Sequence, residues 1–298
     1  MLKASDIYLK KLYKNIYRIR RNIDGSHPSP KGKGFLADLI VIQMMGDTLM
    51  VHSPAIRGER PLPLLVYLHG GGWVIGSNAS CSRFCGELAA TGKAVVVSVG
   101  YPLAPEHPFP EGMEFCSSAL DYIMEHASSW GSAPELVSLG GDSSGGNLAL
   151  SVTLSRIRKG QELPRSLVLF YPVVSAWDDG TPSWNTYGSG FGLDSDLMDA
   201  FNDAYCISGH DSREEALISP SLAEDSELSL IPPSLFIAAE RDILHDQGLD
   251  FCRRIIELGV SVDRRTLSGT VHLFITVPGQ ESAFRESVRA AEEFLKLR

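Results

Sequence analysis

Short apolar runs alternate with longer segments of helical periodicity along most of the chain. The apolar runs predict buried strands at residues 36–45, 49–53, 64–68, 94–99, 136–140, 166–171, 234–239 and 260–267. Apolar residues three and four apart predict helices at residues 81–91, 112–126, 146–159, 195–205, 246–258 and 282–297. Gly46-Asp47, between the first two runs, predicts a hairpin turn. Strands that alternate with helices predict an α/β fold, with a mostly parallel sheet and helices on both faces.

Two segments lie outside this alternation. Residues 175–215 are rich in Trp, Tyr, Ser, Gly and Asp, and long excursions of this kind usually lie over an active site. Residues 1–22 carry seven basic residues and one acidic residue, with a helically spaced apolar stripe at Leu9, Leu12, Ile16 and Ile19. We expect this amphipathic helix to pack its stripe on the protein. The alternative is a helix that lies on a membrane surface.

The composition narrows the class of protein. The chain has 298 residues, of which 44% are hydrophobic and 21% are charged, as in a globular domain with a sizeable core. No apolar run has the length of a membrane span, and the N-terminus lacks the apolar region of a secretory signal. A net charge of −9 disfavours nucleic acid as a partner. The five cysteines form no Cys-x-x-Cys pair, so we expect reduced thiols, no metal site and a cytoplasmic location.

The segment from Gly141 to Gly145 reads Gly-Asp-Ser-Ser-Gly and joins a predicted strand to a predicted helix. In this context the motif predicts a nucleophile elbow, in which Ser143 is strained and its hydroxyl is exposed above the sheet. Glycine is needed at both ends because a Cβ there would crowd the neighbouring strand or helix. Ser143 would also lie at a helix N-terminus, where free N–H groups favour developing negative charge. The alternative interpretation is an ordinary glycine-rich turn.

A nucleophilic serine needs a base and an orienting carboxylate, and both are predicted in loops that follow strands. His272 follows the last predicted strand through a short glycine-containing loop, where α/β folds place functional groups. Three acids, Glu240, Asp242 and Asp246, follow the preceding strand. Asp242 is the best placed, because Asp246 has the position of a helix N-cap. The order serine, acid, histidine is that of the α/β-hydrolases.

Three consecutive glycines follow the predicted strand at 64–68, in the sequence His-Gly-Gly-Gly at 69–72. Because no side chain shields this backbone, its N–H groups can approach a substrate carbonyl oxygen as the oxygen gains charge. We predict that the amides of Gly70 and Gly71, together with that of Ser144, form an oxyanion hole. The alternative is a phosphate-binding loop, which is disfavoured because no Gly-Lys-Ser/Thr or Gly-x-Gly-x-x-Gly pattern is present.

Together these motifs resemble the hormone-sensitive-lipase-like family of α/β-hydrolase esterases. The resemblance begins at about residue 35 and rests on five ordered motifs. They are His-Gly-Gly-Gly-Trp at 69–73, Tyr-Pro-Leu-Ala-Pro-Glu-His-Pro-Phe-Pro at 101–110, Gly-Asp-Ser-Ser-Gly-Gly-Asn at 141–147, Glu-Arg-Asp-Ile-Leu at 240–244 and Gly-Thr-Val-His-Leu-Phe at 269–274. The family usually has alanine where this chain has Ser144 and commonly has arginine where it has Pro102. Neither departure removes a catalytic group.

The resemblance implies one α/β-hydrolase domain over residues 1–298, with cap elements from about 1–34 and 175–215. It implies that Ser143, His272 and Asp242 hydrolyse short-chain carboxylic esters through an acyl-enzyme, without a cofactor or a metal. Aromatic residues predicted to bind the substrate are Trp73, Trp184, Tyr187 and Phe191, and the alternative is that such residues only pack within the cap. The expected partner is a small-molecule ester, with no stable membrane insertion and with a homodimer left open.

Other functions fit the same scaffold. One is a deacetylase or feruloyl-type esterase that acts on decorated carbohydrate. Another is a non-catalytic small-molecule receptor, although receptors on this scaffold commonly lack a member of the triad. All three triad positions are filled here, which favours an enzyme over a receptor.

Overall fold

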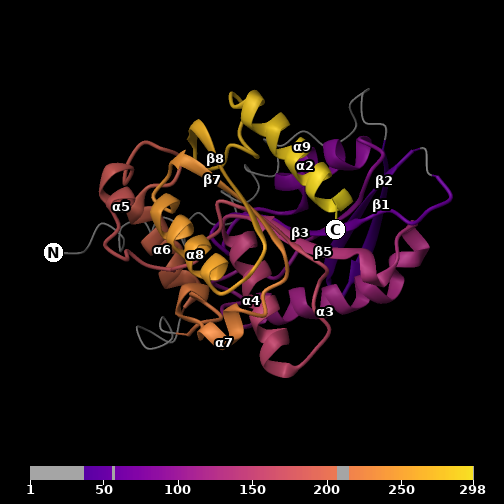
Figure 1. Ribbon diagram of the computed structural model, residues 1–298, viewed down its shortest axis with the longest axis horizontal. Helices are drawn as coiled ribbons and strands as arrows, with labels where there is room; N and C mark the ends of the chain where they lie inside the picture. Colours follow the sequence, from indigo (N-terminus) through magenta and orange to yellow (C-terminus); the bar gives the residue numbers. More distant parts are fainter. Residues whose placement is uncertain (1–36, 56–57, 207–214, 298) are drawn as a thin grey trace.

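The computed structural model describes residues 37–55, 58–206 and 215–297. Over these ranges eight strands form a single sheet in the order β1-β2-β4-β3-β5-β6-β7-β8 (Figure 1). The strands are β1 (Ala37–Met44), β2 (Asp47–Pro54), β3 (Leu64–Leu68), β4 (Val95–Val99), β5 (Val137–Asp142), β6 (Leu167–Phe170), β7 (Ser234–Arg241) and β8 (Val262–Val271). β2 pairs antiparallel with β1 and with β4, and the other pairs are parallel. The predicted α/β fold with a mostly parallel sheet is confirmed.

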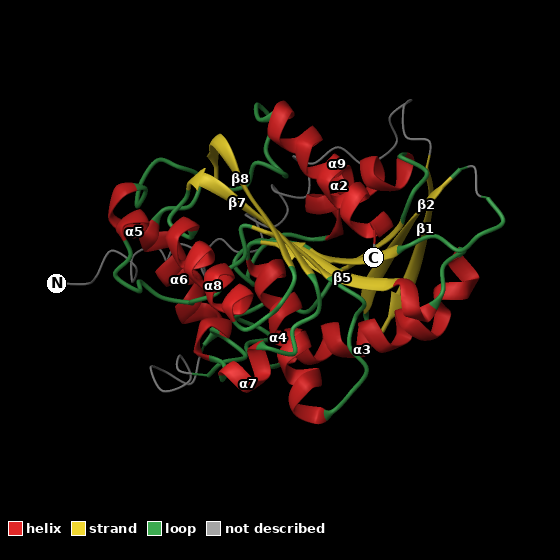
Figure 2. Cartoon of the chain, viewed as in Figure 1, coloured by secondary structure: helices red, strands yellow, loops and turns green. Residues whose placement is uncertain are grey.

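Helices cover both faces of the sheet (Figure 2). α2 (Asn78–Ala90) and α9 (Glu281–Leu297) pack side by side on one face. α3 (Glu111–His126), α4 (Ser144–Lys159) and α8 (His245–Glu257) lie on the other face. Parallel strands need crossover connections, and α2, α3, α4 and α8 each lie in one of them.

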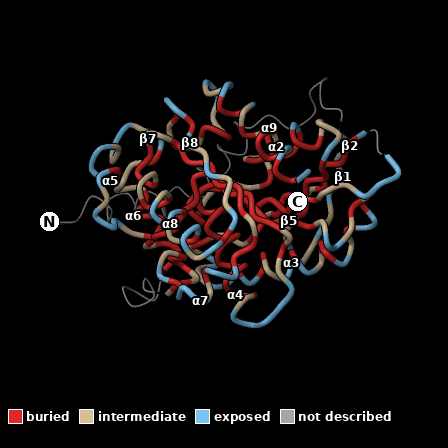
Figure 3. Tube along the Cα trace, viewed as in Figure 1, coloured by how far each residue is buried: buried red, intermediate tan, exposed pale blue. Residues whose placement is uncertain are grey.

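The core therefore consists of two apolar layers, one on each side of the sheet. The buried residues gather at the centre of the molecule, along the strands (Figure 3). In β3, Leu64, Val66 and Leu68 belong to the layer under α3, α4 and α8, whereas Leu65 and Tyr67 belong to the layer under α2 and α9. Every residue of β3 is buried, as is every residue of β4, β5 and β6. A strand that is buried on both faces is mostly apolar, which explains why these segments show no regular alternation of polar and apolar residues.

Some boundaries differ from the prediction for local reasons. The hairpin turn is Met45-Gly46, one residue earlier than predicted, and both residues have positive φ, at 51° and 93°. A two-residue hairpin turn of this kind requires positive φ at both positions. α2 begins at Asn78 rather than at Cys81, because Ser77 forms a capping box in which its hydroxyl accepts from the N–H of Ala79 at 3.1 Å.

The excursion after β6 contains α5 (Pro182–Thr186) and α6 (Ser195–Tyr205), and a further short helix, α7 (Asp225–Leu228), precedes β7. The helix predicted at residues 195–205 is confirmed with the same bounds. The predicted N-terminal cap and its amphipathic helix lie outside the described residues. Among the residues described, no helix is both long and apolar enough to cross a membrane. All five cysteines are buried as thiols.

Candidate active site

The nucleophile elbow has the strained geometry that its sequence predicts. Ser143 joins β5 to α4 with φ 54° and ψ −120°, a conformation that residues with a side chain rarely adopt. A Cβ at Gly141 would lie 2.3 Å from the carbonyl oxygen of Leu68, and one at Gly145 would lie 2.0 Å from it. Only glycine allows the elbow to pack this closely against β3.

Three side chains that are far apart in the sequence meet at the elbow. The Nε2 atom of His272 lies 3.0 Å from the Oγ atom of Ser143. The Nδ1 atom of His272 lies 2.6 Å from the Oδ2 atom of Asp242. Because β7 and β8 are parallel neighbours, the loops that follow them bring the acid and the imidazole to the same edge of the sheet. The arrangement can move a proton from the serine hydroxyl to an imidazole that a carboxylate orients.

The two neighbouring acids are engaged elsewhere. Glu240 lies within β7, and its Oε2 atom accepts from the N–H of Gly269 at 2.5 Å. The prediction that Asp246 caps α8 is wrong, because α8 starts at His245 with Leu244 as its N-cap. Asp246 Oδ2 instead accepts from the N–H of Ser183 at 2.9 Å, in the first turn of α5. It therefore attaches the excursion to the loop that carries Asp242.

The site is covered, so the predicted exposure of the serine hydroxyl is wrong. Ser143 is 5% exposed and His272 is 2% exposed. Two parts of the excursion reach the site: Gly192 packs against His272, and the ring of Phe201 in α6 packs against Gly72. The described residues of the excursion at 175–215 therefore lie over the elbow, as predicted.

The glycine run after β3 presents its amides differently from the prediction. The N–H of Gly70 already donates to the Oδ1 atom of Asp142 at 3.1 Å, so this amide is not free for a substrate. Among the described residues, the amides of Gly71 and Gly72 donate to no acceptor. Ser144 is the first residue of α4, and an N–H at this position has no partner within the helix. The free amides are therefore those of Gly71, Gly72 and Ser144.

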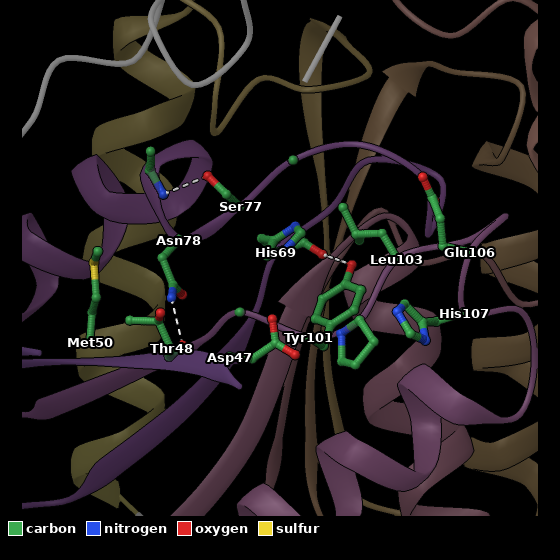
Figure 4. Close-up of a pocket in the computed structure, with 14 residues that line it drawn as sticks. Asp47, Thr48, Met50, His69, Ser77, Asn78, Tyr101, Leu103, Glu106 and His107 are labelled. Carbon is green, nitrogen blue, oxygen red and sulfur yellow. Dashed lines mark hydrogen bonds between the residues drawn. The ribbon is translucent and has the colours of Figure 1, made fainter. Parts of the chain in front are cut away.

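The oxyanion loop, which we define as residues 69–73, is also held from the β4 side. The hydroxyl of Tyr101 donates to the carbonyl of His69 at 2.7 Å, and the two rings stack with centroids 4.3 Å apart. This contact borders an open pocket of about 620 Å³, lined by Asp47, Asn78, Leu103 and others (Figure 4). Ser143 is not among the residues that line this pocket.

The four aromatic residues predicted to bind substrate fall into two groups. Trp73 is 1% exposed and stacks on Tyr205 of α6, with centroids 4.5 Å apart and planes 3° apart. Trp184 is also buried, in α5. Tyr187 and Phe191 are half-buried and meet edge to face at 5.1 Å, in the excursion that covers the serine. Trp73 and Trp184 therefore pack inside the protein, whereas Tyr187 and Phe191 keep part of their surface exposed, and substrate binding by these four residues stays a prediction.

The sequence analysis did not identify several residues that contact the site. The ring of Tyr171 lies 4.7 Å from the imidazole of His272, and this tyrosine comes directly after β6. Its position at the end of a predicted strand was the only available signal. Gly72 was part of the glycine run, but nothing in the run indicated which of its amides were free. Among the described residues, no three His, Cys, Asp or Glu side chains are grouped as metal ligands would be.

The fold, with a serine, a histidine and an aspartate at the carboxyl ends of its strands, defines an α/β hydrolase. The family model for the alpha/beta hydrolase fold matches residues 65–276. The carboxylesterase NlhH of Mycobacterium tuberculosis is 34% identical over 248 residues, covering 81% of this chain and 76% of the relative. An ethyl acetate hydrolase of Pseudomonas putida is 34% identical over 249 residues, covering 80% of this chain and 76% of the relative.

A solved esterase from the archaeon Pyrobaculum calidifontis superposes with a TM-score of 0.83 at 30% identity, covering 98% of this chain and 96% of that chain. The chain belongs to the hormone-sensitive-lipase-like family of α/β-hydrolases, and it is a carboxylic ester hydrolase.

Proposed function

We propose that this enzyme hydrolyses short-chain carboxylic esters through a catalytic triad of Ser143, His272 and Asp242. The observation that carries the proposal is the unbroken line of contacts from the serine Oγ through both imidazole nitrogens to the carboxylate, at 3.0 Å and 2.6 Å. A base within hydrogen-bond reach of a nucleophile, itself oriented by a third group, is the arrangement that activates a serine.

In this mechanism Ser143 Oγ attacks the ester carbonyl carbon while His272 Nε2 takes the hydroxyl proton. Asp242 accepts from the Nδ1–H of the imidazole, which fixes the tautomer and stabilises the cation that forms. His272 then gives the proton to the leaving alcohol oxygen, and an acyl-enzyme remains. A water molecule repeats the sequence, breaks the acyl-serine bond and releases the carboxylic acid.

The oxyanion hole in this proposal consists of the amides of Gly71, Gly72 and Ser144. The amide of Gly72 takes the role that the sequence analysis assigned to the amide of Gly70, because the N–H of Gly70 already donates to Asp142. Preorganised backbone donors aimed at the developing oxyanion are commonly the largest contribution to transition-state stabilisation. Serine in place of alanine at position 144 leaves the backbone N–H unchanged.

A small acyl group is the proposed substrate preference. The serine is nearly buried, and the half-buried pair Tyr187 and Phe191 belongs to the excursion, in which Phe191 directly precedes the Gly192 that packs against His272. The Pseudomonas putida relative carries the name ethyl acetate hydrolase, which is an activity on a two-carbon acyl group. We therefore propose acetyl to butyryl esters as the best substrates.

The test is active-site labelling combined with an acyl-chain series. A serine-directed phosphonate should label the wild-type enzyme at Ser143, and Ser143→Ala should be neither labelled nor active on p-nitrophenyl acetate. Because Ser143→Ala removes only a buried hydroxyl, its melting temperature should remain close to that of the wild type. Labelling at another residue would contradict the assignment.

The same assay decides among substrate classes. Activity should fall from butyrate to octanoate and longer esters. Acetylated sugars and feruloyl esters belong in the same series, and higher kcat/KM on either would favour the carbohydrate esterase alternative. The homodimer and the cytoplasmic location remain predictions, and light scattering on the full chain would test the first of them.

A further inference from the structure

Asp142 carries a buried carboxylate that the mechanism above does not use. It is the last residue of β5, stands directly before Ser143 and is 1% exposed. Its Oδ1 atom accepts from the N–H of Gly70 at 3.1 Å and from the hydroxyl of Tyr67 at 3.0 Å. Its Oδ2 atom has no hydrogen-bond partner among the described residues. In this buried carboxylate one oxygen accepts two hydrogen bonds and the other accepts none, and such an unsatisfied buried oxygen needs an explanation.

The position of this carboxylate links two parts of the site. β3 lies between β4 and β5, so the oxyanion loop that follows β3 has neighbours on both sides. On the β4 side Tyr101 holds His69, and on the β5 side Asp142 holds Gly70. Of these two anchors, only Asp142 is covalently joined to the nucleophile. A Cβ at Gly70 would lie 2.5 Å from Asp142 Oδ2, so the close approach also requires glycine at position 70.

We propose that Asp142 is a positioning residue, whose Oδ1 atom fixes the oxyanion loop relative to the Oγ atom of Ser143. The inference rests on the proposed oxyanion hole, since the amides of Gly71 and Gly72 directly follow the one that Asp142 holds. Small errors in the placement of such donors are costly, because a donor stabilises the oxyanion only at hydrogen-bond distance.

The loop needs the oxygen of Asp142 rather than its charge. Burial raises the pKa of Asp142 to about 6, although the hydrogen bonds from Tyr67 and Gly70 and the charge of His272 lower it in part. Burial raises the pKa values of four groups around it, and the negative charge of Asp142 adds to the effect; these groups are Tyr67, Tyr101, Tyr171 and Cys85. A proton can bind the unpartnered Oδ2 while Oδ1 keeps both of its donors. Asparagine is therefore the matched substitution, because its amide oxygen can take the place of Oδ1.

The experiment compares Asp142→Asn, Asp142→Ala and the wild type on a short-chain ester and on a trifluoromethyl ketone, whose adduct with the serine carries an oxyanion. Asp142→Asn should keep kcat within about threefold of the wild type. Asp142→Ala should lower kcat and the affinity for the ketone in parallel, by about 10- to 100-fold, with little change in KM. A purely structural role would lower the melting temperature without this parallel loss, and would overturn the proposal.

Hydrogen–deuterium exchange supplies a readout that does not depend on activity. The amides of residues 69–73 should exchange faster in Asp142→Ala than in Asp142→Asn, while β3 stays protected in both. If the alanine variant does not fold, Asp142→Ser replaces it, because the serine hydroxyl is too short to reach Gly70. Equal exchange and equal ketone affinity in all the variants would overturn the proposal. A wild-type enzyme without esterase activity or phosphonate labelling would instead contradict the proposed function, and the exchange data would still decide the role of Asp142.

Discussion

Only one of the three acids near the end of β7 reaches His272, and this distinction gives the sharpest test at the scale of single residues. Asp242 also accepts from the N–H of Leu244 at 3.0 Å through its other oxygen, so its side chain is fixed at both ends. Glu240 accepts from the N–H of Gly269, and Asp246 accepts from the N–H of Ser183. Both contacts hold separate segments of the backbone together.

Asp242→Asn should therefore lower kcat by about 10⁴-fold, because an amide favours the wrong imidazole tautomer while it preserves packing. Glu240→Gln and Asp246→Asn keep an acceptor oxygen for their backbone partners, so each should stay within a few-fold of the wild-type kcat. The measurement is kcat for the three variants on one ester under identical conditions. A large loss at Glu240 or Asp246, with Asp242→Asn active, would show that the acid has been assigned to the wrong residue.

That Ser143, His272 and Asp242 lie together could be predicted from the sequence, because parallel strands deliver their following loops to one edge of the sheet. The free amides could not be predicted, because they depend on a contact between Gly70 and Asp142, which are 72 positions apart. The partner of Asp246 was missed for the same reason. Its position before a helix suggested a local cap, but its actual contact is with Ser183, 63 positions earlier in the chain.

At the scale of elements, α6 is the part of the excursion that contacts the oxyanion loop. Phe201 packs on Gly72, and Tyr205 stacks on Trp73. The bounds of α6 could be read from its periodicity, but the partner of its apolar face could not. α5 and α7 were missed because they have 5 and 4 residues, too few to show a helical period.

This packing predicts that Tyr205 supports the loop through its ring. Tyr205→Leu should destabilise the protein by about 1 kcal/mol relative to Tyr205→Phe, because it removes the stacked ring. It should also lower kcat several-fold, since the loop that carries Gly71 and Gly72 loses a contact. Thermal unfolding and kcat on one ester would check both effects.

Tyr205→Phe is the matched control. The Tyr205 hydroxyl has no hydrogen-bond partner among the described residues, so its removal should be neutral or slightly stabilising. If the leucine variant matches the phenylalanine variant in both stability and kcat, α6 does not support the loop through this ring.

At the scale of the whole molecule, buried ionisable groups outside the triad should shape the dependence of stability on pH. Burial lowers the pKa of His52 in β2 to about 4. An unfolded histidine has a pKa of about 6.5, so between these values the unfolded chain binds a proton that the folded chain does not. The stability that comes from neutral His52 is therefore complete above pH 6.5 and is lost as the pH falls, by about 3 kcal/mol at pH 4.

His52→Leu should consequently unfold less readily than the wild type in mild acid, and the difference in melting temperature should grow as the pH falls from 7 to 5. His107→Gln, at a half-exposed histidine, is the surface control. A difference between His52→Leu and the wild type that does not change with pH would contradict this account.

Asp142 acts in the opposite direction over part of the same range. Its pKa of about 6 is above the unfolded value of about 3.9, so the folded state binds the extra proton and stability falls as the pH rises from 4 to 6. The effects of His52 and Asp142 on the pH dependence of stability should therefore partly cancel. Each effect should be clearer in a variant that lacks the other ionisable side chain.

The separation of Ser143 and His272 by 129 positions has a consequence for the order in which the enzyme is made. A ribosome that adds 5–20 residues per second needs roughly 6 to 26 s to travel from the serine codon to the histidine codon. During that interval the nascent chain carries the proposed nucleophile without its proposed base, so by the proposed mechanism it cannot form an acyl-enzyme at an appreciable rate. Ester hydrolysis therefore begins only after the last strand has joined the sheet. The time at which activity first appears after synthesis starts should report when this last step of sheet assembly has taken place.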